Sequence, residues 1–178
     1  MASLALLRVA PLLSATSYVT FTFSEDTFVR PLVHTSTSSA EAKIRRHANR
    51  IFPSLYAFTR RGLPYIFLSY PISIATAAAN LAKTGPGVSF GSDASPQART
   101  AAILYSAGLI FSVLHFPFGP TAMSYLDRVG ADQGVEGDFE ADNTANMAFW
   151  LRINATRGAV ADIPSLICYF FAFLYAMA

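Results

Sequence analysis

Four apolar segments, each long enough to cross a lipid bilayer as a helix, constrain the fold of this chain more than any other feature. They cover residues 2–23, 63–82, 100–120 and 158–178. Because 53% of the 178 residues are hydrophobic and only 13% are charged, the chain has too much apolar surface for a soluble globule of this size. The sequence therefore predicts an all-α integral membrane four-helix bundle that forms a single transmembrane domain over residues 1–178.

The charged residues lie mainly in two of the predicted connections, a basic loop over residues 24–62 and an acidic loop over residues 121–149. Within the basic loop, residues 40–59 are predicted to form a short interfacial helix. With four crossings, ten of the thirteen Lys and Arg residues fall on one side of the membrane. The positive-inside rule then makes both loops cytoplasmic and places both termini on the opposite face, in the endoplasmic reticulum or another endomembrane.

The first apolar segment contains Arg8, whose side chain is expected to extend to the membrane surface. A cleaved signal peptide is the alternative interpretation of this segment. A signal peptide usually begins with basic residues, but none precedes Leu4 here, and no clear small-x-small cleavage site ends the apolar run. We therefore expect the segment to be a spanning helix.

Polar residues inside the segments recur at steps of three and four, so each series occupies one helix face. The series are Ser14, Ser17, Thr20 and Ser24; Ser69, Ser73, Thr76 and Asn80; Tyr105, Gly108, Ser112, His115 and Gly119; and Gly158, Asp162, Ser165 and Tyr169. These faces are predicted to point toward other helices, where small and hydroxylated residues allow close packing and interhelical hydrogen bonds.

Prolines are expected to bend or end the helices at Pro71, Pro117, Pro120 and Pro164. Such bends open space between helices. Together with the aromatic residues nearby, they predict an apolar pocket with a few polar groups, suited to a lipophilic small molecule.

His115 and Asp162 are the ionisable residues of these polar faces, and each is either a structural polar contact or part of a functional site. Arg157 lies just before the last segment, where membrane topology alone also predicts an arginine. Two ion-pair partners are possible for Arg157: Asp162, if the intervening turn is partly unwound, or an acidic residue of the long loop. Asn154 begins the N-glycosylation sequence Asn-Ala-Thr, but a cytoplasmic position would keep it from glycosylation.

Trp150 followed by Asn154 and Arg157, an Asn-x-x-Arg pattern before a final membrane helix, resembles the C-terminal signature of the anthrone oxygenase-like family. The stretches "RRGLPYIFLSYPISIATAAA" and "LHFPFGPTAMSYLDR" are similar to the start of that family's second helix and the end of its third. The resemblance implies a four-helix membrane oxygenase of fungal polyketide pathways that oxidises an anthrone with molecular oxygen and no known cofactor.

Family members often carry a histidine beside the Asn-x-x-Arg pattern, whereas here the neighbours are Ile153, Ala155 and Thr156. Deprotonation of an anthrone requires a base, a group that stabilises the anion and a dry aromatic pocket. The candidate bases in this chain are His115 and Asp162. Arg157 and Asn154 are the candidates for stabilising the oxyanion.

Several functions are not predicted. His34, His47 and His115 show no metal-ligand spacing, and no nucleotide-binding or hydrolase motif is present, so neither a metal site nor a bound cofactor is expected. The expected partners are the lipid bilayer, a lipophilic substrate and other enzymes of its pathway, without nucleic acid. A non-catalytic membrane accessory or scaffold protein of a biosynthetic pathway is the alternative function.

Overall fold

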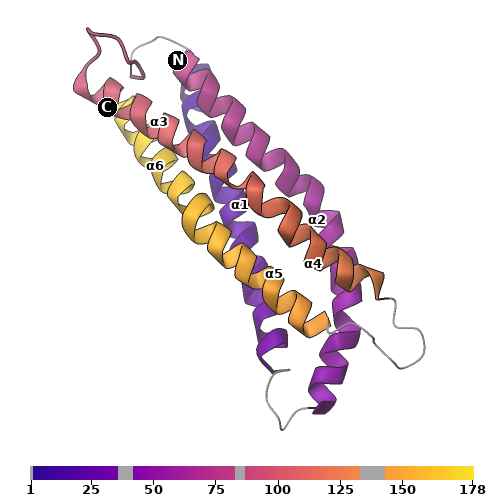
Figure 1. Ribbon diagram of the computed structural model, residues 1–178. Helices are drawn as coiled ribbons and strands as arrows, with labels where there is room; N and C mark the ends of the chain where they lie inside the picture. Colours follow the sequence, from indigo (N-terminus) through magenta and orange to yellow (C-terminus); the bar gives the residue numbers. More distant parts are fainter. Residues whose placement is uncertain (1, 36–41, 83–86, 133–142) are drawn as a thin grey trace. The chain divides into compact units, whose positions relative to one another are not determined.

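The computed structural model describes residues 2–35, 42–82, 87–132 and 143–178, and nearly all of these residues are helical (Figure 1). The elements are α1 (Ala2–Thr35), α2 (Ala42–Ala82), α3 (Pro96–Leu114), the 3-10 turn η2 (Phe116–Phe118), α4 (Gly119–Ala131), α5 (Asn143–Arg157), the π turn η3 (Gly158–Asp162) and α6 (Ile163–Met177). Four helical stretches are long and apolar enough to cross a membrane: Ala2–Val33, Thr59–Ala82, Pro96–Ala131 and Asn143–Met177. The predicted all-α membrane fold is confirmed, and these stretches are consistent with an integral membrane protein.

Contacts divide the chain into two compact units. Unit 1 consists of Met1–Thr20, Tyr65–Phe116 and Gly158–Ala178, and unit 2 consists of Phe21–Pro64 and Pro117–Arg157. Each unit is described by itself below. The single domain predicted over residues 1–178 stays a prediction.

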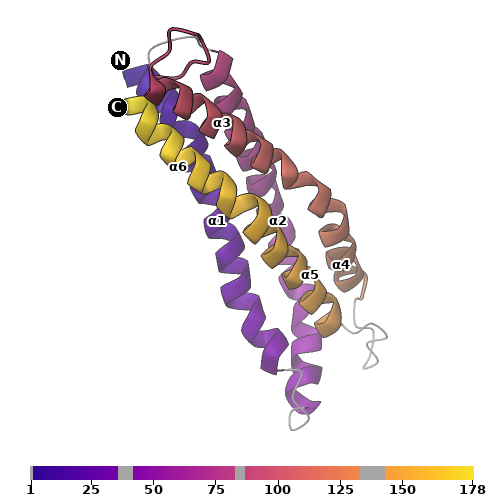
Figure 2. The same ribbon diagram turned by 60° about the vertical axis from the view of Figure 1, so that its left-hand side comes forward.

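Unit 1 is built around α3 and α6, which run side by side in both views (Figures 1 and 2). The start of α3 is fixed by Ser95, whose hydroxyl accepts a hydrogen bond from the Ala98 backbone N–H at 3.1 Å, and by Pro96 in the first turn. Small and aromatic side chains alternate in its core, which includes Ala15, Tyr18, Val19, Tyr70, Ala77, Val88, Ala101, Ala102, Tyr105, Tyr169, Ala172 and Ala176. Close approach of the helices therefore depends on small residues that face large rings.

The side chain of Arg8 packs inside unit 1, where the residue is only 9% exposed. The guanidinium donates a hydrogen bond to the Ala176 carbonyl at 2.5 Å, near the C-terminal end of α6. That end leaves backbone carbonyls without helical partners and carries a partial negative charge, so a cation stabilises it. The beginning of α1 and the end of α6 consequently lie at the same end of unit 1, in agreement with an even number of crossings.

In unit 2, helices extend into both segments that were predicted to be loops. In place of a loop over residues 24–62, α1 continues to Thr35 and α2 begins at Ala42, so the helix expected over residues 40–59 is the first part of α2. In place of a loop over residues 121–149, α4 continues to Ala131 and α5 begins at Asn143. The helices continue because they bury a second core, which includes Val29, Val33, Phe52, Ala122, Leu126, Val129, Met147, Trp150 and Leu151. The intervening residues 36–41 and 133–142 lie outside the described part of the chain.

The polar faces predicted on the later helices are largely buried. The face predicted on the first helix is confirmed at Ser14, which is buried and donates to the Ser69 carbonyl at 2.6 Å, but not at Thr20. Thr20 is exposed, and the inward face of α1 instead follows Tyr18, Thr22, Glu25 and Val29. Pro71 does not interrupt α2, which continues to Ala82. α3 does end shortly before the prolines that were expected to terminate it, but the chain continues through η2 into α4.

Candidate functional site

Asp162 is the most deeply buried charged residue of unit 1, with 1% of its surface exposed. It is the last residue of η3, and Pro164 follows in the first turn of α6. A π turn accommodates one more residue than a regular turn of α-helix, and such turns are frequent at functional sites. Proline cannot donate a backbone hydrogen bond at its own position, so the helix is irregular where Asp162 points inward.

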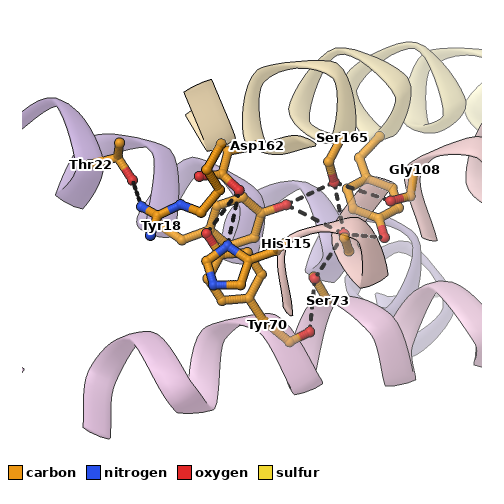
Figure 3. Close-up of polar contacts among 11 residues, drawn as sticks. Tyr18, Thr22, Tyr70, Ser73, Gly108, His115, Asp162 and Ser165 are labelled. Carbon is orange, nitrogen blue, oxygen red and sulfur yellow. Dashed lines mark hydrogen bonds and ion pairs between the residues drawn. The ribbon is translucent and has the colours of Figure 1, made fainter. Parts of the chain in front are cut away.

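Asp162 forms a compact cluster with Tyr70 of α2 and His115, the residue that caps α3 (Figure 3). The Tyr70 hydroxyl donates to Oδ1 of Asp162 at 3.0 Å, and Nδ1 of His115 lies 3.3 Å from the same oxygen. The imidazole also lies over the Tyr70 ring, with 3.5 Å between the ring centroids. Because all three residues are at most 8% exposed, water screens their interactions little.

This cluster has the components of an acid–base site. A carboxylate beside an imidazole can accept a proton from a substrate and hold the resulting charge, and the phenol can donate a hydrogen bond to either group. The arrangement brings together the two candidate bases predicted from the sequence, His115 and Asp162. Tyr70 is the third member, which the sequence did not predict as a site residue.

A second set of polar groups in unit 1, made of hydroxyls, lies beside the Asp162 cluster (Figure 3). Ser165 Oγ is 2.8 Å from both Tyr18 Oη and Ser112 Oγ, and Ser112 Oγ is 3.0 Å from Tyr169 Oη. Ser165 also donates to the Gly108 carbonyl at 3.2 Å. These groups carry no charge, and their hydrogen bonds join α1, α3 and α6 in the way expected of interhelical contacts in lipid.

Tyr18 connects this hydroxyl network with the Asp162 cluster through its ring. The Tyr18 and Tyr70 rings are stacked, with centroids 4.1 Å apart and planes inclined by 13°. Unit 1 therefore holds a charged cluster and a neutral hydroxyl network that share one aromatic contact.

Three fungal proteins are similar to this chain over almost its whole length. Epoxidase pydX from Acremonium sp is 32% identical over 178 residues, which cover 98% of this chain and 96% of that protein. The probable epoxidase scpX from Mollisia scopiformis is 30% identical, with 97% of this chain and 96% of that protein covered. The chain belongs to this family of fungal epoxidases.

A third relative of this epoxidase family, epoxidase gkaX from Penicillium citrinum, is 28% identical over 98% of this chain and 97% of its own. No protein-family model and no solved structure matches the chain. None of the three relatives is called an anthrone oxygenase, so that resemblance stays a prediction.

The other two predicted site residues of this epoxidase-family chain lie in unit 2. Arg157 donates to the Thr22 hydroxyl at 2.9 Å, and the Asn154 amide donates to Oε2 of Glu25 at 3.3 Å. Asn154 is 3% exposed and Arg157 is 7% exposed, so neither is an ordinary headgroup contact. The Asn154 side-chain oxygen is buried and accepts no hydrogen bond from the described residues.

The sequence placed Tyr70 only among the aromatic residues of the expected pocket, without a role in acid–base chemistry, and it did not predict Glu25, although both carry a recognisable signal. Tyr70 shares a face with Ser73, Ala77 and Asn80, at steps of three and four residues. Glu25 continues the spacing of Tyr18 and Thr22, but the predicted segment ended at residue 23. Extending the helical period beyond the most apolar residues would have found it.

The apolar aromatic pocket expected from the sequence stays a prediction. Tyr70 and Tyr169 belong to the core of unit 1, whereas Trp150 belongs to that of unit 2. Among the described residues, no group of three or more His, Cys, Asp or Glu side chains is arranged to hold a metal ion. His47 is exposed, and the His34 side chain lies outside the described part of the molecule.

Proposed function

We propose that this protein is a membrane-embedded epoxidase that transfers one atom of molecular oxygen to a carbon–carbon double bond of a lipophilic intermediate in fungal secondary metabolism. The observation that carries the proposal is its similarity to epoxidases over 98% of its length. The buried Asp162–His115–Tyr70 cluster supports it, since an ionisable cluster at membrane depth is costly unless it serves a function.

The electron balance of the reaction suggests a class of substrate. When one oxygen atom enters the substrate, the other leaves as water, which consumes two protons and two electrons. We infer that the substrate itself supplies them, so that no bound cofactor is needed. An electron-rich phenol or enol of an aromatic polyketide, such as an anthrone-like or hydroquinone intermediate, meets this requirement: a hydroquinone and dioxygen balance to a quinone epoxide and water.

The protein's role would be to remove the first proton and hold the anion away from water. Asp162 and His115 form the base, and the Tyr70 hydroxyl stabilises whichever group carries the charge. Asn154 and Arg157, both buried in unit 2, stay the candidates that the sequence predicts for stabilising an oxyanion.

We further propose that the protein works in an endomembrane such as the endoplasmic reticulum, with the residues between the first and second and between the third and fourth spans on the cytoplasmic side. The bilayer would hold and deliver the lipophilic substrate, and other enzymes of the same pathway would be its protein partners. Nucleic acid has no role in this proposal.

Product analysis tests the function. Microsomes that contain the protein are incubated with candidate phenols under air, nitrogen and ¹⁸O₂, each with and without NADPH, and with Asp162→Asn and Tyr175→Phe variants. Tyr175 is 41% exposed and serves as the matched control. We expect an epoxide with one ¹⁸O atom, formed without NADPH by the wild type and Tyr175→Phe but strongly reduced in Asp162→Asn.

Each contrary result has a definite meaning. A strict requirement for NADPH would contradict the substrate as electron donor while leaving the epoxidase intact. Equal product from all three proteins, after correction for spontaneous oxidation, would contradict catalysis and favour a non-catalytic accessory or scaffold protein.

A further inference from the structure

Unit 1 buries an unusual number of phenol side chains. Tyr18, Tyr70, Tyr105 and Tyr169 are each at most 2% exposed, and they are the largest fully buried side chains of the unit. Phenylalanine would fill the same volume without a polar atom that needs a partner in lipid. The hydroxyls of Tyr18, Tyr105 and Tyr169 bond to serines or to a backbone carbonyl, which gives them a structural role.

Tyr70 differs from the other three because its hydroxyl donates a hydrogen bond to a carboxylate. Its hydroxyl lies 3.0 Å from Oδ1 of Asp162. Its ring packs against the imidazole of His115 and against the ring of Tyr18. A phenol that loses an electron becomes a very strong acid, so its oxidation is easy only where a proton acceptor is already in place. In a buried site without water, Asp162 provides that acceptor.

We propose that Tyr70 is a redox-active tyrosine of this site, with Asp162 as its proton acceptor. In the step, the Tyr70 O–H bond breaks, the proton forms an O–H bond with the Asp162 carboxylate, and one electron passes to a one-electron oxidant. The products are a neutral tyrosyl radical, a protonated Asp162 and the reduced oxidant. In an oxygenase, a substrate-derived peroxyl radical is an oxidant of this class, and gaining the electron alone converts it to a peroxide anion while the Tyr70 proton stays on Asp162.

The surroundings of Tyr70 favour a persistent radical. The stacked Tyr18 ring, with its centroid 4.1 Å away, and the imidazole, with its centroid 3.5 Å away, exclude solvent from both the ring and its oxygen. The retained proton on Asp162 allows the phenol to re-form when an electron returns. The proposal rests on the proposed oxygenase only for the identity of the natural oxidant, because the redox property belongs to the residues themselves.

The test needs no substrate. The purified full chain in lipid nanodiscs is oxidised by light with a ruthenium polypyridyl complex and persulfate, frozen after increasing delays and examined by electron paramagnetic resonance. Protein grown with ring-deuterated tyrosine identifies tyrosyl signals by their narrowed lines. We expect a tyrosyl signal that outlives those of exposed tyrosines, that is lost in Tyr70→Phe and that decays faster in Asp162→Asn.

Tyr175→Phe is the matched control, because it removes a partly exposed phenol of the same unit and should leave the persistent signal unchanged. Circular dichroism and thermal unfolding show whether each variant is folded. If Tyr70→Phe does not fold, folded Asp162→Asn still decides the question, because loss of the proton acceptor should shorten the lifetime of the persistent signal whereas Tyr175→Phe should not.

A persistent signal of equal size in folded Tyr70→Phe, or an unchanged lifetime of the signal in folded Asp162→Asn, would overturn the proposal. An active epoxidase without this radical would contradict the redox role of Tyr70 and leave the proposed function standing. A persistent radical in a protein without epoxidase activity would contradict the proposed function and leave the redox role standing. The two failures are therefore distinguishable.

Discussion

Gly108→Ala should destabilise unit 1 by about 2 kcal/mol, because α3 and α6 meet at a point where no side chain fits. A Cβ atom at position 108 would lie 2.5, 2.7 and 3.0 Å from three ring atoms of Tyr169, whereas ordinary contacts begin at 3.4 Å. The Tyr169 ring is fully buried, so relief of this overlap requires a movement of roughly 1 Å against its neighbours.

The magnitude follows from three effects. Overpacking of this kind costs about 1–3 kcal/mol, and so severe an overlap belongs near the upper limit. Movement of the ring also weakens the 3.0 Å hydrogen bond between Tyr169 and Ser112, which contributes about 0.6 kcal/mol in a typical membrane helix pair. Alanine offsets roughly 1 kcal/mol of this loss, because it has a better helix propensity than glycine.

Equilibrium unfolding in mixed detergent micelles measures the difference. Gly119→Ala is the matched control, because a Cβ there meets nothing within 4 Å, and its stability should change by less than about 0.5 kcal/mol. In a Tyr169→Leu background, where the ring is gone, most of the cost of Gly108→Ala should disappear. An equal cost in both backgrounds would refute the close contact as its cause.

Four further predictions test the remaining features of the chain. Asp162→Asn keeps the shape of the side chain but cannot accept a proton, so turnover should fall by about 10²–10⁴-fold while circular dichroism stays unchanged. Deletion of Val160, an exposed residue of the π turn, should restore regular α-helix, rotate Asp162 away from its partners and abolish activity, whereas Val160→Ala should be active. Arg8→Met loses the hydrogen bond to Ala176, and thermal unfolding should show a loss of roughly 1.5–3 kcal/mol. Glu25→Ala removes the carboxylate that accepts a hydrogen bond from the buried Asn154 amide in unit 2 and should cost roughly 1–3 kcal/mol in the same assay, and an unchanged midpoint would contradict its structural role.

The sequence predicted the membrane-spanning elements well because their signal is local. Long apolar segments cross a bilayer wherever they occur, and steps of three and four residues identify the buried faces without knowledge of the neighbours. His115 and Asp162 stood out for the same reason, since an ionisable residue on such a face is rare. Their approach to 3.3 Å in the structure follows from two correctly predicted faces.

The sequence failed where packing between distant segments decides the structure. Residues 24–35 contain Glu25, Asp26 and Arg30, so their composition resembles a loop, yet α1 continues there to bury Val29 and Val33. Asp26 and Arg30 form an exposed ion pair four residues apart that suits the outer face of this helix. The π turn also has no compositional signature, because it depends on one additional residue between two helical stretches.

The polar residues of unit 1 fall into two classes with different energetic roles. Ser112, Ser165 and the Tyr18 hydroxyl satisfy one another, so they hold helices together at little cost. Asp162 carries a cost of about 2.5–3.5 kcal/mol on insertion scales, and a serine or asparagine would bond to Tyr70 without that cost. Helix packing alone therefore gives no reason for a carboxylate at the end of a π turn. A group that accepts and returns a proton needs the charge, and the same requirement explains why the Tyr70 phenol, which donates to Asp162, also lies against an imidazole.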